Sequence, residues 1–331
     1  MTDEALAQLS NNLVYATLIV LALALVAYAA DLAFGSGRAR ARAAAAPHRV
    51  TVNAGVSAGA PPAVDVPDAA DDRGADHDRY GRIGVALTAL AFGLLLAAIV
   101  ARGVSAGRPP WGNMYEFSLA GVLSALGVFL FLLLVGRKVR YLGVFIVLAA
   151  LMTLGVAVVV LYTESAQLVP ALKSYWLWIH VTAAIISSGI FTVATGATVM
   201  YLVADAADRR EASGRPGSLV AAVASHLPEA ATLDRVAYRT IAFGFPLWFF
   251  TIVAGAVWAE AAWGRYWGWD PKETWSFVTL VLYAAYLHAR ATAGWKGRSS
   301  ALIALAAYGC FLFNYFGVNI WFFGLHSYGG V

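Results

Sequence analysis

Five tryptophans lie within eighteen consecutive residues of this chain. They are Trp258, Trp263, Trp267, Trp269 and Trp275. Gly264 and Gly268 stand between them, and glycine lets the backbone turn sharply between flat rings. A belt of aromatic residues at a membrane interface would not need such close spacing. The run therefore indicates a broad apolar surface for a planar ligand.

Charged residues in the same loop suggest what that ligand carries. Arg265 and Lys272 can pair with carboxylates, so a haem with two propionates has a suitable shape and charge. A quinone head or a lipid would suit the same chemistry. Asp270, followed by Pro271 and Glu273, has the pattern of a helix N-cap with a capping box, and it can equally be a ligand contact.

Two histidines are expected at the level of this loop. His180 lies near the start of the apolar run 175–204, with Trp176 one turn earlier, and His326 follows the apolar run 300–323. Two imidazoles from different helices beside an aromatic surface are what bis-histidine ligation of haem iron requires. The alternative is a pair of unrelated interfacial histidines with satisfied hydrogen bonds.

A third histidine is expected at a different depth. His288 follows Trp275 on the same apolar run, about 20 Å deeper at roughly 1.5 Å per helical residue. Alanines at 284, 285, 289 and 291 leave room for another helix. This predicts a transmembrane haem site shared with a partner chain, or else an interfacial histidine near Arg290.

The composition is that of a membrane protein. Of 331 residues, 60% are hydrophobic and 13% are charged, whereas soluble domains have roughly 25% charged residues. Eight runs are long and apolar enough to span a bilayer as helices. They are 13–34, 83–101, 116–135, 141–162, 175–204, 240–262, 275–293 and 300–323. We therefore predict an all-α polytopic integral membrane protein with about eight transmembrane helices.

The basic residues predict the orientation. Eighteen of the 23 Lys and Arg residues fall on one set of alternate loops and five on the other. Because basic loops stay in the cytoplasm, both termini are expected on the outer face, together with 102–115, 163–174 and 263–274. The net charge of +4 then needs no nucleic-acid partner.

The chain divides into three expected parts. Residues 1–35 form an N-terminal transmembrane helix, which an acidic start distinguishes from a signal peptide. Residues 36–80, rich in Ala, Gly, Pro and Asp, form a flexible cytoplasmic linker. Residues 81–331 form a membrane domain whose external loop is 258–275.

Cysteine usage excludes several kinds of chemistry. Cys310 is the only cysteine, so the chain forms no internal disulfide or thiol relay. The sequence contains no C-x-x-C-H run, so the chain is not itself a c-type cytochrome. His48, His77 and His226 fall on expected cytoplasmic stretches and are interpreted as solvated.

Three segments together resemble a known family. Residues 263–275 read Trp-Gly-Arg-Tyr-Trp-Gly-Trp-Asp-Pro-Lys-Glu-Thr-Trp, a WWD motif. The segments Trp178-Ile-His180-Val and Gly324-Leu-His326-Ser-Tyr-Gly accompany it. They resemble the CcsA subunit, also called ResC and in actinobacteria CcsB, of the System II cytochrome c maturation machinery. Residues 110–118 resemble the family's external segment, and the resemblance covers about 83–330.

The resemblance implies roles for the residues above. His180 and His326 would be the external axial ligands of haem iron, and His288 would belong to a transmembrane haem site. The platform of the WWD motif would comprise Trp263, Trp267, Trp269, Asp270 and Trp275. Haem b, held non-covalently, would cross to the outer face for thioether attachment to the C-x-x-C-H segment of apocytochrome c.

The resemblance also implies partners and a location. A separate ResB-like membrane protein is expected, in the plasma membrane, with the WWD loop on the extracytoplasmic side. Whether the chain is an enzyme on its own, as a cytochrome c synthase component, stays open. Asn113 and Glu116 either shape the outer vestibule or begin the third apolar helix.

Two other functions fit the same residues. One is a haem transporter or chaperone that takes no part in attachment. The other is a cytochrome b-type membrane anchor, which would need paired histidines within the membrane. His288 has no obvious partner of that kind in this sequence.

Overall fold

The computed structural model describes residues 2–34, 69–164, 174–214, 219–292 and 294–327. Within these ranges all regular secondary structure is helical, as predicted. The long helices are α1 (Thr2–Phe34), α3 (Ala69–Ala106), α4 (Met114–Leu134), α5 (Gly143–Val159), α6 (Tyr175–Ala212), α8 (Ala230–Trp263), α9 (Pro271–Ala291) and α10 (Arg298–Leu312). The short ones are η1 (Arg140–Leu142), α7 (Leu219–Ala224), the π-helix η3 (Phe313–Gly317) and α11 (Val318–Trp321).

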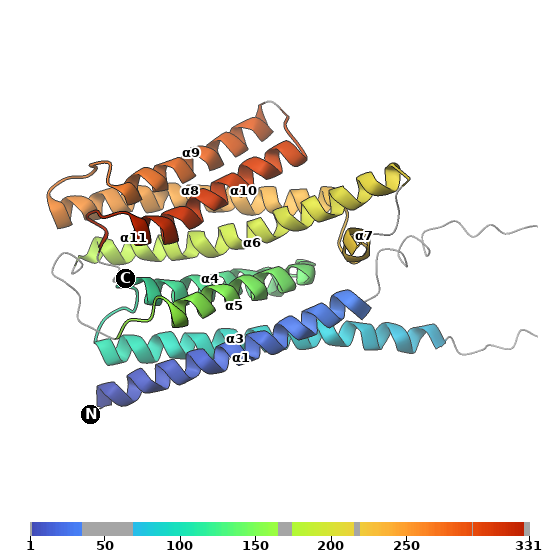
Figure 1. Cartoon of the computed structure of the whole chain (residues 1–331), viewed down its shortest axis with the longest axis horizontal. Helices are drawn as coiled ribbons and strands as arrows, with labels where there is room; N and C mark the ends of the chain where they lie inside the picture. Colours follow the sequence, from blue (N-terminus) through green and yellow to red (C-terminus); the bar gives the residue numbers. More distant parts are fainter. Residues whose placement is uncertain (1, 35–68, 165–173, 215–218, 293, 328–331) are drawn as a thin grey trace, which may run out of the picture.

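Each of the eight predicted apolar runs falls on a helix, and in the described residues seven helical stretches are long and apolar enough to cross a membrane. The run 275–293 lies on α9, which is not among the seven. Its charged ends and its tryptophan, tyrosines and threonines make it less apolar than its neighbours. Figure 1 shows α9 running beside α8 and α10, so it still contributes one pass of the bundle.

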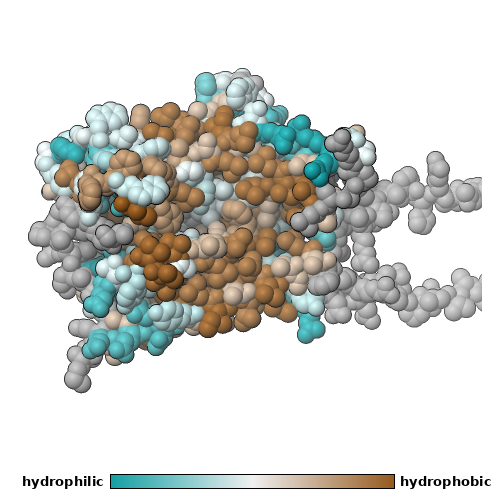
Figure 2. Space-filling view, in the orientation of Figure 1, coloured by the Kyte–Doolittle hydropathy of each residue, from teal (hydrophilic) through white to brown (hydrophobic). Residues whose placement is uncertain are grey.

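The helices form one elongated bundle. Figure 1 shows α1 paired with α3 along one side, α4 and α5 beside them, α6 in the middle, and α8, α9 and α10 on the other side. A buried apolar core joins α1, α3, α4, α5 and α6, and a second, largely aromatic core joins α6, α8, α9 and α10. Figure 2 shows apolar side chains concentrated around the middle of the bundle and hydrophilic ones towards its ends.

One end of the bundle carries the WWD loop, and we call it the site end. Helices α4, α6 and α9 begin there, and α3, α5 and α8 end there (Figure 1). The start of α1 and the short helix α11 also lie at this end. A chain that runs along the bundle an even number of times begins and ends on the same side. The predicted linker 36–80 lies mostly outside the described residues, although α3 already begins at Ala69.

A π-helix interrupts the last long helical run. Residues Phe313–Gly317 have π geometry between α10 and α11, and single π turns within helices are frequent at functional sites. Two side chains of this segment link it to the rest of the site end. Asn314 Nδ2 donates to Ser276 Oγ of α9 at 2.8 Å, and the Tyr315 hydroxyl donates to the Met114 carbonyl of α4 at 2.8 Å.

Candidate functional site

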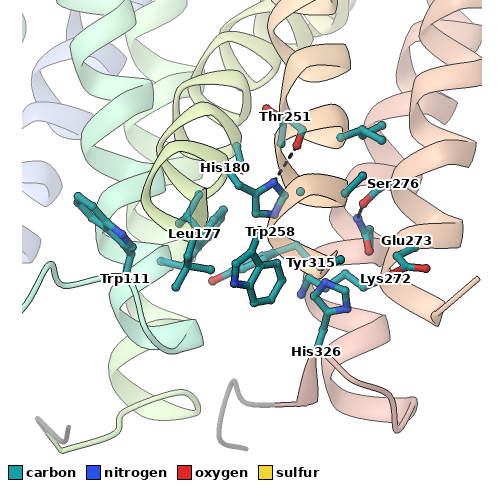
Figure 3. Close-up of a pocket in the computed structure, with 18 of the residues that line it drawn as sticks. Trp111, Leu177, His180, Thr251, Trp258, Lys272, Glu273, Ser276, Tyr315 and His326 are labelled. Carbon is teal, nitrogen blue, oxygen red and sulfur yellow. Dashed lines mark hydrogen bonds between the residues drawn. The ribbon is translucent and has the colours of Figure 1, made fainter. Parts of the chain in front are cut away.

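A cavity opens at the site end of the bundle. Its walls come from the start of α4, the turns of α6 and α8 nearest the site end, the first turns of α9, and the segment from α10 to α11. His180 of α6 and His326, which follows α11, both line it (Figure 3). The sequence prediction that these two histidines share a level is confirmed by this placement.

The backbone of α8 holds His180 in place. Its Nδ1–H donates to the Thr251 carbonyl at 2.8 Å, which leaves Nε2 for a ligand in the cavity (Figure 3). Gly255 lies one turn further along α8, and a Cβ atom there would lie 2.6 Å from the imidazole Cε1. Only glycine therefore lets α8 approach the imidazole this closely.

A carboxylate holds His326 in the same way. Its Nδ1–H donates to Asp270 Oδ1 at 3.2 Å, and the Leu325 N–H donates to Asp270 Oδ2 at 3.2 Å. Burial lowers the pKa of His326, and the bond to Asp270 opposes this only in part. Burial would raise the pKa of Asp270, but the hydrogen bond and charge of His326, the Leu325 N–H and the charge of Arg265 together outweigh burial, so the pKa is lowered. A neutral imidazole with an ionised partner is the form that binds a metal.

The predicted start of α9 is confirmed. Pro271 is the first helical residue, and the Glu273 carboxylate accepts the N–H groups of Gly268 at 2.8 Å and Asp270 at 3.0 Å. Asp270 therefore occupies the cap position of α9 and also contacts His326. The N-cap interpretation of Asp270 is therefore confirmed, and a direct contact of Asp270 with a bound ligand stays a prediction.

Trp258 lies between the two imidazoles (Figure 3). Its ring stacks on His180 with a centroid distance of 6.0 Å and meets His326 edge-on at 5.6 Å. Trp263 contacts His326 at 4.9 Å, and Trp267 lines the cavity. Trp258 and Trp263 thus contact the histidines, and Trp267 belongs to the same cavity wall.

The other two tryptophans lie away from the cavity. Trp269 is 64% exposed and contacts Trp267 and Phe277. Its φ of +59° is in the left-handed region, which non-glycine residues seldom adopt. Trp275 packs on Phe313 at 4.4 Å. The motif therefore supplies the cavity wall and also the contacts that support the loop.

The two basic residues of the loop have different surroundings. Lys272 lines the cavity, and its Nζ donates to Asn319 Oδ1 at 2.7 Å. Arg265 donates to Glu273 Oε1 at 3.4 Å and lies over the Trp263 ring. Lys272 is thus the one placed to meet an anionic group of a ligand, whereas Arg265 ties the loop to α9.

The segment before α4 forms the opposite wall, and a buried charge cluster holds it. Asn113 caps α4, its Oδ1 accepting the Glu116 N–H at 2.9 Å. Glu116, fully buried, accepts from Arg102 Nε at 2.9 Å, Arg108 at 2.8 and 3.0 Å, and Gly112 N–H at 2.8 Å. The interpretation that Asn113 and Glu116 begin α4 is therefore confirmed. Of the two, Asn113 also lines the cavity, whereas Glu116 holds the segment before α4 from behind the lining.

The lining residues that were not predicted from the sequence include Trp111, Trp248, Asn314 and Tyr315. Trp111 belongs to the segment 110–118, whose resemblance to the family's external segment could have identified it as a site residue. The other three lie in apolar helices, where nothing in the local sequence distinguishes them from core residues.

His288 lies far from the cavity. It is exposed on α9, towards the end opposite the site end. Stacked and edge-on aromatic rings fill the space between, with Phe191 on Tyr283 at 4.1 Å and Trp248 on Phe311 at 5.5 Å. The structure therefore brings His180 and His326 together and leaves His288 on an outer surface of the bundle.

The fold and the site define a class of protein: a polytopic membrane protein with an aromatic cavity at one end that contains two histidines. Residues 111–326 match the family described as Cytochrome C assembly protein. A cytochrome c biogenesis protein CcsA from Synechococcus elongatus is 38% identical over 287 residues, covering 75% of this chain and 87% of the relative. The CcsA of Guillardia theta is 37% identical over 263 residues, covering 75% and 85%.

The chain therefore belongs to the CcsA family and acts in cytochrome c biogenesis. This process involves haem and apocytochrome c. The matched range contains the whole described cavity lining, from Trp111 to His326, whereas α1 and α3 lie before it.

Proposed function

We propose that this chain binds haem b non-covalently in the cavity and presents it for thioether attachment to apocytochrome c. The observation that carries the proposal is the meeting of His180 and His326 around Trp258, each with its Nδ1 held by a protein acceptor. Such second-shell bonds fix the ring orientation and leave Nε2 for iron.

The residues of the cavity fit haem. The described residues contain no group of three or more His, Cys, Asp or Glu side chains that could hold a metal ion, so the porphyrin would supply the other nitrogen ligands. Aromatic rings from Trp258 and Trp267 suit a flat macrocycle. Lys272 supplies a cation for a propionate.

For attachment, haem must be held in the correct position relative to the thiols, and the reactive groups belong to haem and apocytochrome c and not to this chain. A thiol of the C-x-x-C-H segment adds across a haem vinyl group: a sulfur–carbon bond forms, and the thiol hydrogen goes to the other vinyl carbon. The chain would contribute the orientation of haem relative to the thiols. On release, the histidine of the C-x-x-C-H segment replaces His180 or His326.

A second haem site involves His288 and a ResB-like partner. His288 is exposed on α9 next to Ala284, Ala285 and Ala289, where a partner's helix can approach closely. Arg290 holds this end of α9 to α8 through two hydrogen bonds to Asp234, at 2.6 and 2.8 Å.

The orientation in the membrane follows from the basic loops. Because basic loops mark the cytoplasmic side, the site end faces outward from the plasma membrane.

Purified protein tests the proposal directly. The chain, extracted in detergent from cells that make haem, is expected to carry haem with the reduced absorption spectrum of a six-coordinate low-spin iron. A chain that contains no haem and binds none on titration would contradict the proposal. Copurification of a ResB-like protein and of apocytochrome c would separate attachment from simple haem transport.

Gly255→Ala tests the ligand geometry without changing a ligand. The added methyl group would lie 2.6 Å from the His180 ring, so the imidazole must turn away and lose its bond to Thr251. We expect haem affinity to fall about tenfold, since overpacking typically costs roughly 1–3 kcal/mol. Absorption titration with haem measures the change.

Gly93→Ala is the matched control. Gly93 lies within α3, and nothing lies within 4 Å of the added Cβ position. Alanine favours helix at both positions, so a loss confined to Gly255→Ala cannot come from a weakened helix. Equal affinity in the two variants would show that His180 does not need its present position.

A further inference from the structure

Resting on the proposed function, we propose that haem lies in the cavity in one defined orientation about its axial direction. Its propionate edge faces Lys272 and Asn314, and its vinyl edge faces Trp111 and Leu177. Figure 3 shows Trp111 and Leu177 on one side of the cavity and Lys272, Glu273 and Ser276 on the other, with His180 and Trp258 between them.

The Asn314 side chain is the first group that indicates a binding site for a haem carboxylate on this wall. It is 5% exposed and lines the cavity, with Nδ2 bonded to Ser276 Oγ and Oδ1 without a partner among the described residues. A serine hydroxyl both donates and accepts, so the amide can turn over, keep its bond to Ser276 and present its NH₂ to the cavity. A buried amide with one end unpaired is costly unless a ligand satisfies it.

Lys272 is the second group on the same wall. Its ammonium carries three N–H donors, and its bond to Asn319 uses one of them. The neighbouring Glu273 carboxylate accepts from Gly268, Asp270 and Arg265, so those bonds offset its charge. A cation and an amide on one wall suit the two propionates of haem.

The opposite wall is mainly apolar. Leu177 and Val181 of α6 and Phe117 of α4 line it, and burying a carboxylate against them would be unfavourable. Trp111 contributes an indole N–H that has no partner among the described residues. One neutral donor is a weaker partner for a propionate than an ammonium with an amide, so the reverse orientation is disfavoured.

This orientation determines which wall of the cavity the reacting edge of haem faces. The vinyl groups lie on the pyrrole rings opposite the propionates, so they face α4, α6 and the segment that carries Trp111. The thiols of apocytochrome c would then approach from this side. The buried cluster around Glu116 holds the Trp111 segment and so keeps that side in shape.

Resonance Raman spectra of the haem-loaded protein test the orientation, because propionate and vinyl bending vibrations give separate bands. Asn314→Leu and Lys272→Met are expected to shift the propionate band and leave the vinyl bands unchanged. Trp111→Phe, which removes the N–H and keeps a ring, is expected to shift only the vinyl bands. A propionate band that moves in Trp111→Phe and stays in the other two variants would overturn the proposal.

A second measurement covers variants that bind haem poorly. Wild-type protein is titrated with haem and with haem dimethyl ester, whose propionates are uncharged. We expect about tenfold weaker binding of the ester, since charge-assisted hydrogen bonds are lost, and nearly equal binding of both by Lys272→Met. Thr192→Val, which removes a half-buried hydroxyl bonded to Tyr308 outside this cavity, should keep the wild-type ratio.

The outcomes separate the two proposals. Equal binding of haem and its ester by wild-type protein would overturn the orientation alone. A wild-type protein that binds neither would overturn the proposed function itself.

Discussion

His180→Ala and His326→Ala are each expected to change the bound haem from six-coordinate low-spin to five-coordinate high-spin, and the double variant is expected to lose it. Each imidazole would supply one axial ligand through Nε2. Loss of a second-shell partner alone typically weakens metal binding about 10–100-fold, so loss of both ligands should exceed that range. Reduced absorption spectra and haem titration measure both effects.

Added imidazole provides a further test of this prediction. It should restore the low-spin spectrum in each single variant, because it can occupy the space of the missing side chain. His226→Ala is the control, since His226 lies between α7 and α8 and bonds within its own turn to the Ala222 carbonyl. A low-spin spectrum that survives both single substitutions would contradict the assignment of these ligands.

Glu116→Leu is expected to lower the free energy of unfolding strongly. Glu116 is fully buried and is shared by Arg102, which is 1% exposed, and Arg108. Removing one partner from a buried ion pair typically costs about 3–5 kcal/mol, because the other charge stays buried without it. Thermal unfolding in detergent should therefore begin at a clearly lower temperature than in the wild type.

The same change should also weaken haem binding. Without Glu116, the Gly112 N–H and both guanidinium groups lose the acceptor that fixes the Trp111 segment against α4. Glu260→Leu makes the same replacement at an exposed position on α8 and should leave stability nearly unchanged. A Glu116→Leu protein as stable as Glu260→Leu would show that the buried cluster does not hold the site end together.

The sequence was sufficient to predict the all-helical membrane fold. A spanning helix must satisfy its backbone hydrogen bonds within one apolar run, so each helix leaves a local signal. The start of α9 was also predictable, because Asp270, Pro271 and Glu273 are neighbours in sequence and act on one helix end. The shared level of His180 and His326 followed from their places at the ends of two such runs.

The tertiary structure decided which side chains meet. Asn314 lies on a π turn of the last helical run, where it lines the cavity and bonds to Ser276 of α9. Trp258 and Trp263 contact the histidines and Trp267 lines the cavity, whereas Trp269 and Trp275 lie outside it. This division depends on how the loop folds between α8 and α9.

The buried ion cluster is another feature that the sequence alone did not predict. Arg102, Arg108 and Glu116 have ordinary places in the sequence near two helix ends, yet they are drawn into one cluster that also holds the Thr163 carbonyl. Contacts of this kind join segments that are separate along the chain, and no local periodicity records them. The sequence therefore determined the helices and the candidate ligands, while packing between helices determined the shape, the polarity and the bonded partners of the cavity.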